Sequence, residues 1–243
     1  MASTTAEAAS TPRLTSSGVA RLITVFATLV VEAALFFGGA GSLALPRGWA
    51  YYGGLLAYML SAVAVLLVRF PGVIEIVNER GKLNKAGVKR WDKAFQGAYV
   101  GLLIITPVLA GLDAGRFHWS AAPAPVAAPA LVVSALAYTF VYWAMAVNRF
   151  AETGVRVQVD RGQVVVSSGP YGLVRHPFYA AAIVIQLAYP PAVGSLYAFL
   201  PALATAGLFV WRTAREDATL RAELPGYLEY AARVRYRLLP GVW

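Results

Sequence analysis

The sequence predicts an all-α integral membrane protein with about six transmembrane helices. The last two helices are expected to form a hairpin, followed by a helical extension on the cytoplasmic side. The mean hydropathy is +0.59 and charged residues make up only 14% of the chain, which is typical of membrane proteins. Apolar runs recur with the length that a hydrocarbon core about 30 Å thick requires. Basic residues are concentrated in the segments that six crossings place on one side.

The elements follow from these runs in chain order. Membrane spans are expected at residues 19–41, 48–69, 95–112, 127–147, 178–190 and 193–211. Pro190-Pro191 separates the last two spans, because two prolines in succession end one helix and open the next. Residues 1–18 are rich in Ala, Ser and Thr and are expected to form a disordered tail. The first run is too long for a signal-peptide core, so we interpret it as a retained anchor. A four-helix membrane region at 19–147 then precedes a functional core at 148–243.

The basic residues predict the orientation. With the N-terminus in the cytoplasm, six spans place both termini and the loops at 70–94 and 148–177 inside. Only Arg47 and Arg116 of the 21 Lys and Arg residues then lie outside, and the other 19 lie inside. This asymmetry is the positive-inside pattern of a multi-pass plasma or inner membrane protein. It also explains the net charge of +9 without a nucleic-acid partner.

Several chemistries have no residues to support them. The chain has no cysteine and only two histidines, His118 and His176, so we expect no metal centre.

Glu32 is the only acid inside a predicted span away from its ends, and it either has a functional role or faces a packed polar partner. The basic stretch at 79–93 either contacts solvent and lipid headgroups or binds substrate.

A first polar cluster precedes the fifth span. The alternating stretch at 155–166 predicts either a short strand or an extended segment, and Gly169-Pro170-Tyr171-Gly172 predicts a turn. Pro177 suits the first turn of the next helix, which places Arg175 and His176 at its N-terminus. Free backbone N–H groups there favour an anion, and Tyr179 follows one turn later near the same face.

A second polar cluster follows the last span, whose helix is expected to continue to Pro225-Gly226. Arg212 with Glu216, and Asp217 with Arg221, are spaced four residues apart and are expected to pair on the helix surface. Such pairs are equally typical of a solvated helix end. A shorter amphipathic helix is predicted at residues 226–236, on the membrane surface.

The two clusters flank one hairpin, so both are expected at the cytoplasmic face. An anion-binding edge then lies beside an acidic edge, and a ligand that carries both charges would satisfy both. S-adenosylmethionine is such a ligand, because it has a carboxylate, an ammonium group, a sulfonium and ribose hydroxyls.

The residues of both clusters resemble a known family. Gly169-Pro170-Tyr171 and the sequence Arg-His-Pro-Phe-Tyr at 175–179 resemble the RHPxYxG motif of integral membrane methyltransferases. This group includes isoprenylcysteine carboxyl methyltransferases and phospholipid N-methyltransferases. The stretch at 212–240 resembles the second motif of the group, so the resemblance covers residues 148–240. The chain departs from the pattern at Ala181, where a glycine is usual, at Asp217, where a second glutamate is usual, and at Arg233, where a tyrosine is usual.

The resemblance implies a cytoplasmic S-adenosylmethionine-dependent methyltransferase core at 148–243. It implies that Arg175 orients a carboxylate and that Glu216 accepts a proton from an amine or thiol acceptor. The cofactor-binding residues that it implies are Tyr171, Leu173, Val174, His176, Pro177, Tyr179, Glu216 and Asp217. Asn148, Arg149 and Arg212 are expected to bind the substrate.

The expected acceptor is lipid-like, either a prenylcysteine carboxylate or an aminophospholipid, and it reaches the site from the surrounding membrane lipids. An activated methyl group needs alignment and electrostatics rather than a metal or a protein nucleophile. Two rival functions remain at this point: an NADPH-dependent membrane reductase, and a transporter or scaffold without enzymatic activity. The sequence leaves the oligomeric state open.

Overall fold

The computed structural model describes residues 13–82 and 86–243, and every regular element in these ranges is helical. The long helices are α1 (Ser16–Ala40), α2 (Pro46–Arg69), α4 (Arg90–Gly111), α5 (Ala127–Val147), α6 (Pro177–Val193) and α7 (Phe199–Glu223). The short ones are α3 (Gly72–Gly81), α8 (Tyr227–Arg233), the π-helix η1 (Leu112–Phe117) and the 3-10 helices η2 (Ala124–Val126), η3 (Val159–Arg161) and η4 (Gly169–Gly172).

Four helices are long and apolar enough to cross a membrane. They are α1, α2, α4 together with η1, and α5 together with η2, while α6 is a shorter apolar helix. Each has a mean hydropathy of 1.7 or more in its most apolar window, and most side chains there are not buried inside the protein. Apolar side chains in this position are stable only when lipid surrounds them. The chain is therefore a multi-pass membrane protein.

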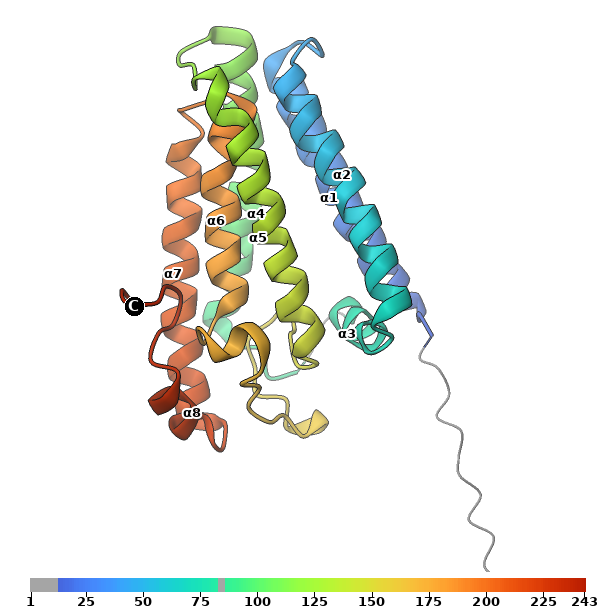
Figure 1. The fold of residues 1–243 in the computed structure, drawn as a ribbon, viewed down its shortest axis with the longest axis vertical. Helices are drawn as coiled ribbons and strands as arrows, with labels where there is room; N and C mark the ends of the chain where they lie inside the picture. The colour runs from blue at the N-terminus through green and yellow to red at the C-terminus, as the bar shows by residue number, and fades with distance from the viewer. Residues whose placement is uncertain (1–12, 83–85) are drawn as a thin grey trace, which may run out of the picture.

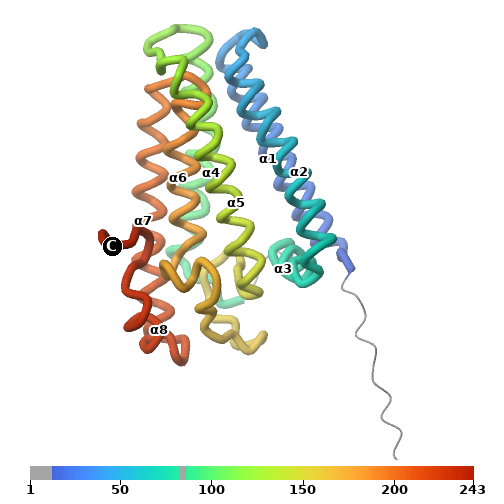
Figure 2. The backbone as a smooth tube through the Cα atoms, viewed as in Figure 1, coloured from blue at the N-terminus to red at the C-terminus, as the bar shows by residue number. Residues whose placement is uncertain are grey.

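The long helices form two groups (Figures 1 and 2). Helices α4, α5, α6 and α7 form a bundle in which α6 packs between α5 and α7. Helices α1 and α2 form a hairpin that leans against the bundle near η1 and diverges from it toward the opposite end, where α3 and α8 lie. We call these the η1 end and the α8 end. Helix α3 lies in the opening between the two groups (Figure 2).

Two glycines allow α1 to approach its neighbours closely at both ends. A Cβ atom on Gly111 would lie 2.0 Å from the main-chain oxygen of Phe36, so any side chain there would separate α4 from α1. At the α8 end, a Cβ atom on Gly81 would lie 1.8 Å from the main-chain oxygen of Ser17. Because real Cβ atoms do not come this near to a backbone oxygen, these contacts fix the tilt of α1.

Helices occur at all six predicted positions, and α7 ends at Glu223, just before Pro225-Gly226 as predicted. The prediction for Pro190-Pro191 is wrong, because both prolines lie inside the last turns of α6. The carbonyl of Pro190 accepts the main-chain N–H groups of Gly194 and Ser195, at 3.0 and 3.1 Å. Prolines lack a donor but keep this acceptor, so they can close a helix that has already formed.

Four further predictions are corrected. The first of the two alternatives for 155–166, a strand, is wrong, since that segment is irregular around η3. The predicted tail at 1–18 is wrong for its last residues, because α1 begins at Ser16 behind a Thr15 cap; residues 1–12 lie outside the described ranges. The basic stretch at 79–93 is not one loop: α3 includes its first residues and α4 its last, with residues 83–85 not described. The predicted helix at 226–236 is shorter, Tyr227–Arg233.

Candidate active site

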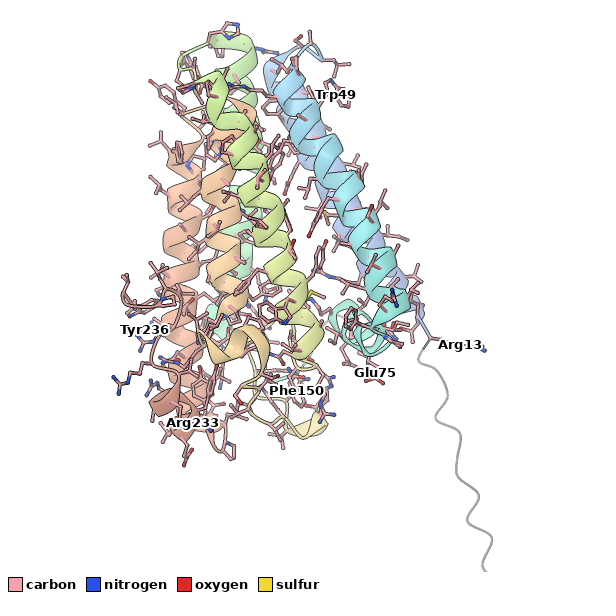
Figure 3. The ribbon with its side chains drawn as sticks, in the orientation of Figure 1. Arg13, Trp49, Glu75, Phe150, Arg233 and Tyr236 are labelled. Atoms are coloured by element: carbon pink, nitrogen blue, oxygen red, sulfur yellow. The ribbon has the colours of Figure 1, made fainter. Side chains whose placement is uncertain are left out.

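A cavity of about 610 Å³ lies between the α1–α2 hairpin, α3 and the bundle, and it continues to the α8 end. Its size is within the range of ligand sites in proteins. Figure 3 shows the side chains that project between the hairpin and the bundle, with Phe150 at the α8 end below α5. Most of the residues singled out in the sequence line this cavity: Asn148, Tyr171, Arg175, His176, Pro177, Tyr179, Arg212 and Glu216. The hairpin of α6 and α7 therefore does bring the two polar clusters together.

Four of the singled-out residues lie elsewhere. Arg149, Leu173, Val174 and Asp217 are not among the residues that line the cavity. The guanidinium of Arg149 instead lies over the ring of Phe150, 4.8 Å from its centroid. Leu173 is exposed and Val174 is buried in the turn that follows η4. A direct contact from these four to a ligand in the cavity stays a prediction from the resemblance.

Glu216 and Tyr179 form the acidic wall of the cavity. The Tyr179 hydroxyl donates a hydrogen bond to Oε2 of Glu216, across the gap between α6 and α7. The ring of His176 stacks on that of Tyr179, with centroids 5.8 Å apart and planes 6° apart. Two flat rings and a carboxylate thus border the same space.

Arg212 provides a cation beside this wall, with its guanidinium 5.1 Å from the ring centroid of Tyr179, and its partner differs from the prediction. It pairs with Asp92 of α4, with Nη2 2.9 Å from Oδ1, and not with Glu216. Nη2 also donates to the carbonyl of Thr153 at 2.6 Å, and the guanidinium lies 4.3 Å from the ring centroid of Phe95. Its Nε has no hydrogen-bond partner among the described residues although it is buried. A buried donor without an acceptor is costly, so Nε is suited to a ligand in the cavity.

Asp217 is enclosed behind the cavity and joins five side chains. Its oxygens accept hydrogen bonds from Nε of Arg175, Arg221 and Arg237, at 2.7, 2.9 and 3.0 Å. The Tyr227 hydroxyl donates at 3.0 Å, and His176 Nε2 lies 3.4 Å away. Burial alone would raise the pKa of Asp217, but the hydrogen bonds from His176 and the arginines hold this pKa far below its usual range. The predicted pair with Arg221 is confirmed.

The hydrogen-bond donors at the start of α6 bind main-chain carbonyls of the C-terminal segment. The Nη1 atom of Arg175 donates to the carbonyls of Val234 and Arg235, at 2.8 and 2.7 Å. The main-chain N–H groups of Arg175 and His176 donate to the carbonyls of Tyr236 and Arg237, both at 2.9 Å. The prediction that these N–H groups are free to bind an anion is therefore wrong. Arg175 lines the cavity, but its guanidinium mainly fastens residues 234–237 to α6 and α7.

The η4 turn lines the cavity through Tyr171. Burial raises the pKa of Tyr171 to about 12, against a smaller lowering by a hydrogen bond with the side chain of Asn148. The carbonyl of Tyr171 accepts a hydrogen bond of 2.7 Å from the buried hydroxyl of Tyr230 in α8. Helix α8 thus supports the η4 turn.

Two basic residues also line the cavity: Arg80, at the end of α3, and Arg21, near the start of α1. Arg80 belongs to the basic stretch at 79–93, for which substrate binding was one alternative, whereas Arg21 was not singled out from the sequence. Neither has a carboxylate partner among the described residues. Arg80 donates to the carbonyl of Ala151 at 3.2 Å and lies over the ring of Phe178. Burial, and then the nearby charge of Arg21, lowers the pKa of Arg80 to about 10. The signal for α3 was present, because Val73, Ile76 and Val77 follow the i, i+3, i+4 spacing of a buried helix face.

Comparison with known families agrees with this site. Residues 130–222 match the model of the isoprenylcysteine carboxyl methyltransferase (ICMT) family. The match includes most of α5, the η4 turn, α6 and nearly all of α7, and so the cavity residues of both clusters. No curated protein matches the chain. Residues 130–222 are therefore similar to this family of methyltransferases, and the apolar helices of the described residues suit a multi-pass membrane protein.

Proposed function

We propose that the protein transfers a methyl group from S-adenosylmethionine to a lipid-like acceptor at the cytoplasmic face of a plasma or inner membrane. The observation that carries this proposal is the single cavity that joins both motif clusters to the interior of the membrane helices. The positive-inside pattern supports a cytoplasmic α8 end, because the α8 end collects nearly all the basic residues.

The residues at the α8 end of the cavity fit the cofactor. Glu216 suits an ammonium group or ribose hydroxyls, and it is next to the flat rings of Tyr179 and His176. An aromatic face also attracts a sulfonium cation. The unpartnered Nε of Arg212 suits a carboxylate. Charges of both signs therefore border one space, as a zwitterionic ligand requires.

The chemistry asks little of the protein. The bound cofactor supplies a methyl group that already has a sulfide leaving group. Tyr179 and Glu216 are held to each other, and Arg212 beside them is held by Asp92, so these polar groups have fixed positions at the α8 end of the cavity. Such fixed groups align two reactants and replace water around them. A carboxylate acceptor needs no base, whereas an amine acceptor would pass its proton to Glu216.

The acceptor reaches the site from the membrane. The part of the cavity between α1, α2 and α5 is lined mainly by aliphatic side chains, which suit a hydrocarbon chain: Leu22, Val25, Leu29, Met59, Val63, Leu66, Val141 and Met145. Removing such a chain from water is favourable by about 25 cal/mol per Å². Arg80 and Arg21 at the inner end suit an anionic headgroup, which favours a carboxylate acceptor over an amine.

Cofactor binding is tested with the purified protein in detergent. S-adenosylhomocysteine is expected to raise the melting temperature, because it binds only the folded state. Glu216→Gln is expected to lose this shift. Glu223→Gln is the matched control, because Glu223 is on the same helix but pairs with Lys89 at the surface. Equal shifts in both variants would remove Glu216 from the site. Stabilisation by NADPH instead of S-adenosylhomocysteine would favour the reductase, and stabilisation by neither would contradict the proposal.

Acceptor chemistry is tested in native membranes. With radiolabelled S-adenosylmethionine, a prenylcysteine with a free carboxylate is expected to be labelled, and the same compound as a methyl ester is not. Labelling of an aminophospholipid alone would instead assign the amine chemistry to Glu216.

A further inference from the structure

The cavity has a second polar region, inside the membrane and away from both motif clusters. Its centre is Glu32, in the middle of α1, which lines the cavity. No hydrogen bond or ion pair connects Glu32 to another described residue. A carboxyl group inside a membrane span is costly unless it has a partner, and it is therefore a sign of function.

Tyrosines gather around this carboxyl group from four other helices. Those close enough to interact with it electrostatically, all of which line the cavity, are Tyr51, Tyr52, Tyr99, Tyr138 and Tyr189. The hydroxyls of Tyr52 and Tyr189 are hydrogen-bonded to each other at 2.7 Å. Glu32 is left without such a bond. The region is polar enough to hold a ligand group but supplies no partner for its only carboxyl group.

The distance from this region to the basic inner end of the cavity follows from α1. Arg21, on the same helix, lines the inner part of the cavity and lies near Arg80. Eleven positions separate Arg21 from Glu32, so at 1.5 Å per residue their levels are about 16 Å apart along the helix. Aliphatic residues of α1, such as Val25 and Leu29, line the cavity between the two levels.

We propose that Glu32 binds a hydrogen-bond donor in the tail of the acceptor, about 16 Å along α1 from the level of Arg21. This inference rests on the proposed methyl transfer at the α8 end. A plain hydrocarbon tail would leave the carboxyl group of Glu32 without a partner, and it would cover the tyrosine hydroxyls with methylene groups. A tail with a hydroxyl or amino group at that distance would satisfy Glu32. The preferred acceptor is then an amphiphile with two polar ends, an acceptor with a plain hydrocarbon tail is bound less tightly, and Glu32 determines this preference.

The test uses three matched probes: dodecanoate, 12-hydroxydodecanoate and 12-aminododecanoate. Their chain is about as long as the distance between the two polar regions. Binding to the purified protein is measured by the rise in melting temperature with probe concentration. The wild-type protein is expected to bind the two substituted probes about tenfold more tightly than dodecanoate, as one buried hydrogen bond to a carboxyl group implies.

Two variants separate the chemistry of the donor. Glu32→Leu is expected to abolish the preference for both substituted probes. Glu32→Gln keeps an acceptor oxygen without the negative charge. If this variant still prefers the hydroxyl probe but no longer prefers the amino probe, the charge of Glu32 contributes to binding the amino group. Glu75→Gln is the control, because Glu75 lies on α3 and does not line the cavity. It is expected to leave all three affinities unchanged.

The proposal is overturned if the wild-type protein shows no preference for the substituted probes, whether it binds all three equally or none. It is also overturned if Glu32→Leu and Glu32→Gln change all three affinities by one factor. The melting shift with S-adenosylhomocysteine is recorded on each variant, and it is expected to be independent of Glu32. Loss of that shift in the wild-type protein would contradict the proposed function and leave the subsite standing, so the two failures are distinguishable.

Discussion

Replacing Asp217 by Asn tests the ion-pair cluster that closes the α8 end. The substitution keeps the shape of the side chain and removes its charge. The side chains of Asp217 and Arg175 are 0% and 2% exposed, so the guanidinium would keep its charge in a buried place without a counter-ion. Breaking a buried pair in this way costs about 3–5 kcal/mol. The amide would also direct donor hydrogens at one of the three arginines.

The control is Glu223→Gln, which breaks a pair of similar length. Lys89 Nζ lies 2.6 Å from Glu223 Oε1, but the two side chains are 31% and 44% exposed. Water and salt screen such a pair, and its loss is expected to cost less than about 1 kcal/mol. The free energy of unfolding is measured for both variants by denaturant titration in mixed micelles. A cost for Asp217→Asn no larger than that for Glu223→Gln would refute the assignment of a closed, buried cluster.

The pH dependence gives a second measurement. The hydrogen bonds depress the native pKa of Asp217 below that of the unfolded chain, which is about 3.9. The stability that they contribute is therefore fully present above the unfolded pKa and is lost as the pH falls below it. The difference between the wild-type protein and Asp217→Asn is expected to stay constant from about pH 5 to pH 8 and to shrink in stronger acid. A difference that already falls between pH 7 and pH 5 would contradict the assigned pKa.

Three shorter tests concern packing and the site. Gly81→Ala is expected to lower the melting temperature, because its Cβ atom would lie 1.8 Å from a main-chain oxygen of α1; Gly72→Ala, on the same helix with no atom within 4 Å, is expected not to. Tyr230→Phe removes a 2.7 Å bond to a buried carbonyl of the η4 turn and is expected to cost about 1–3 kcal/mol in unfolding free energy. Tyr179→Phe frees Glu216 and is expected to reduce the melting shift with S-adenosylhomocysteine more than Tyr58→Phe does, since Tyr58 does not line the cavity. Equal effects of Gly81→Ala and Gly72→Ala, or of Tyr179→Phe and Tyr58→Phe, would contradict the corresponding contact.

The apolar runs predicted the long helices because hydropathy over about 20 residues responds to the membrane alone. Helix α3 was missed because its apolar face consists of only three residues. It lies in a segment that was interpreted as a loop because of its basic charge. The prediction for Pro190-Pro191 was wrong because the rule that prolines break a helix does not consider whether they lie in its last turns, as they do in α6. Local patterns do not state what a segment packs against.

The candidate site was predicted in part for the same reason. The hairpin argument brought Arg175 and Glu216 to one cavity, since that follows from chain topology. It did not predict that residues 234–237 return to bind Arg175, or that Arg212 pairs with Asp92 from another helix. These contacts join segments far apart in the chain, and one sequence contains no signal for them.

The lean of α1 and α2 gives the molecule a wedge shape, narrow at the η1 end and broad at the α8 end (Figure 1). Such a wedge displaces more lipid from one leaflet than from the other. The leaflet around the broad end must therefore stretch or bend, and the elastic energy depends on membrane curvature. The protein can be reconstituted in a known orientation into vesicles of decreasing radius. The amount of protein in vesicles of each radius is expected to show whether membrane curvature alone determines where the protein accumulates.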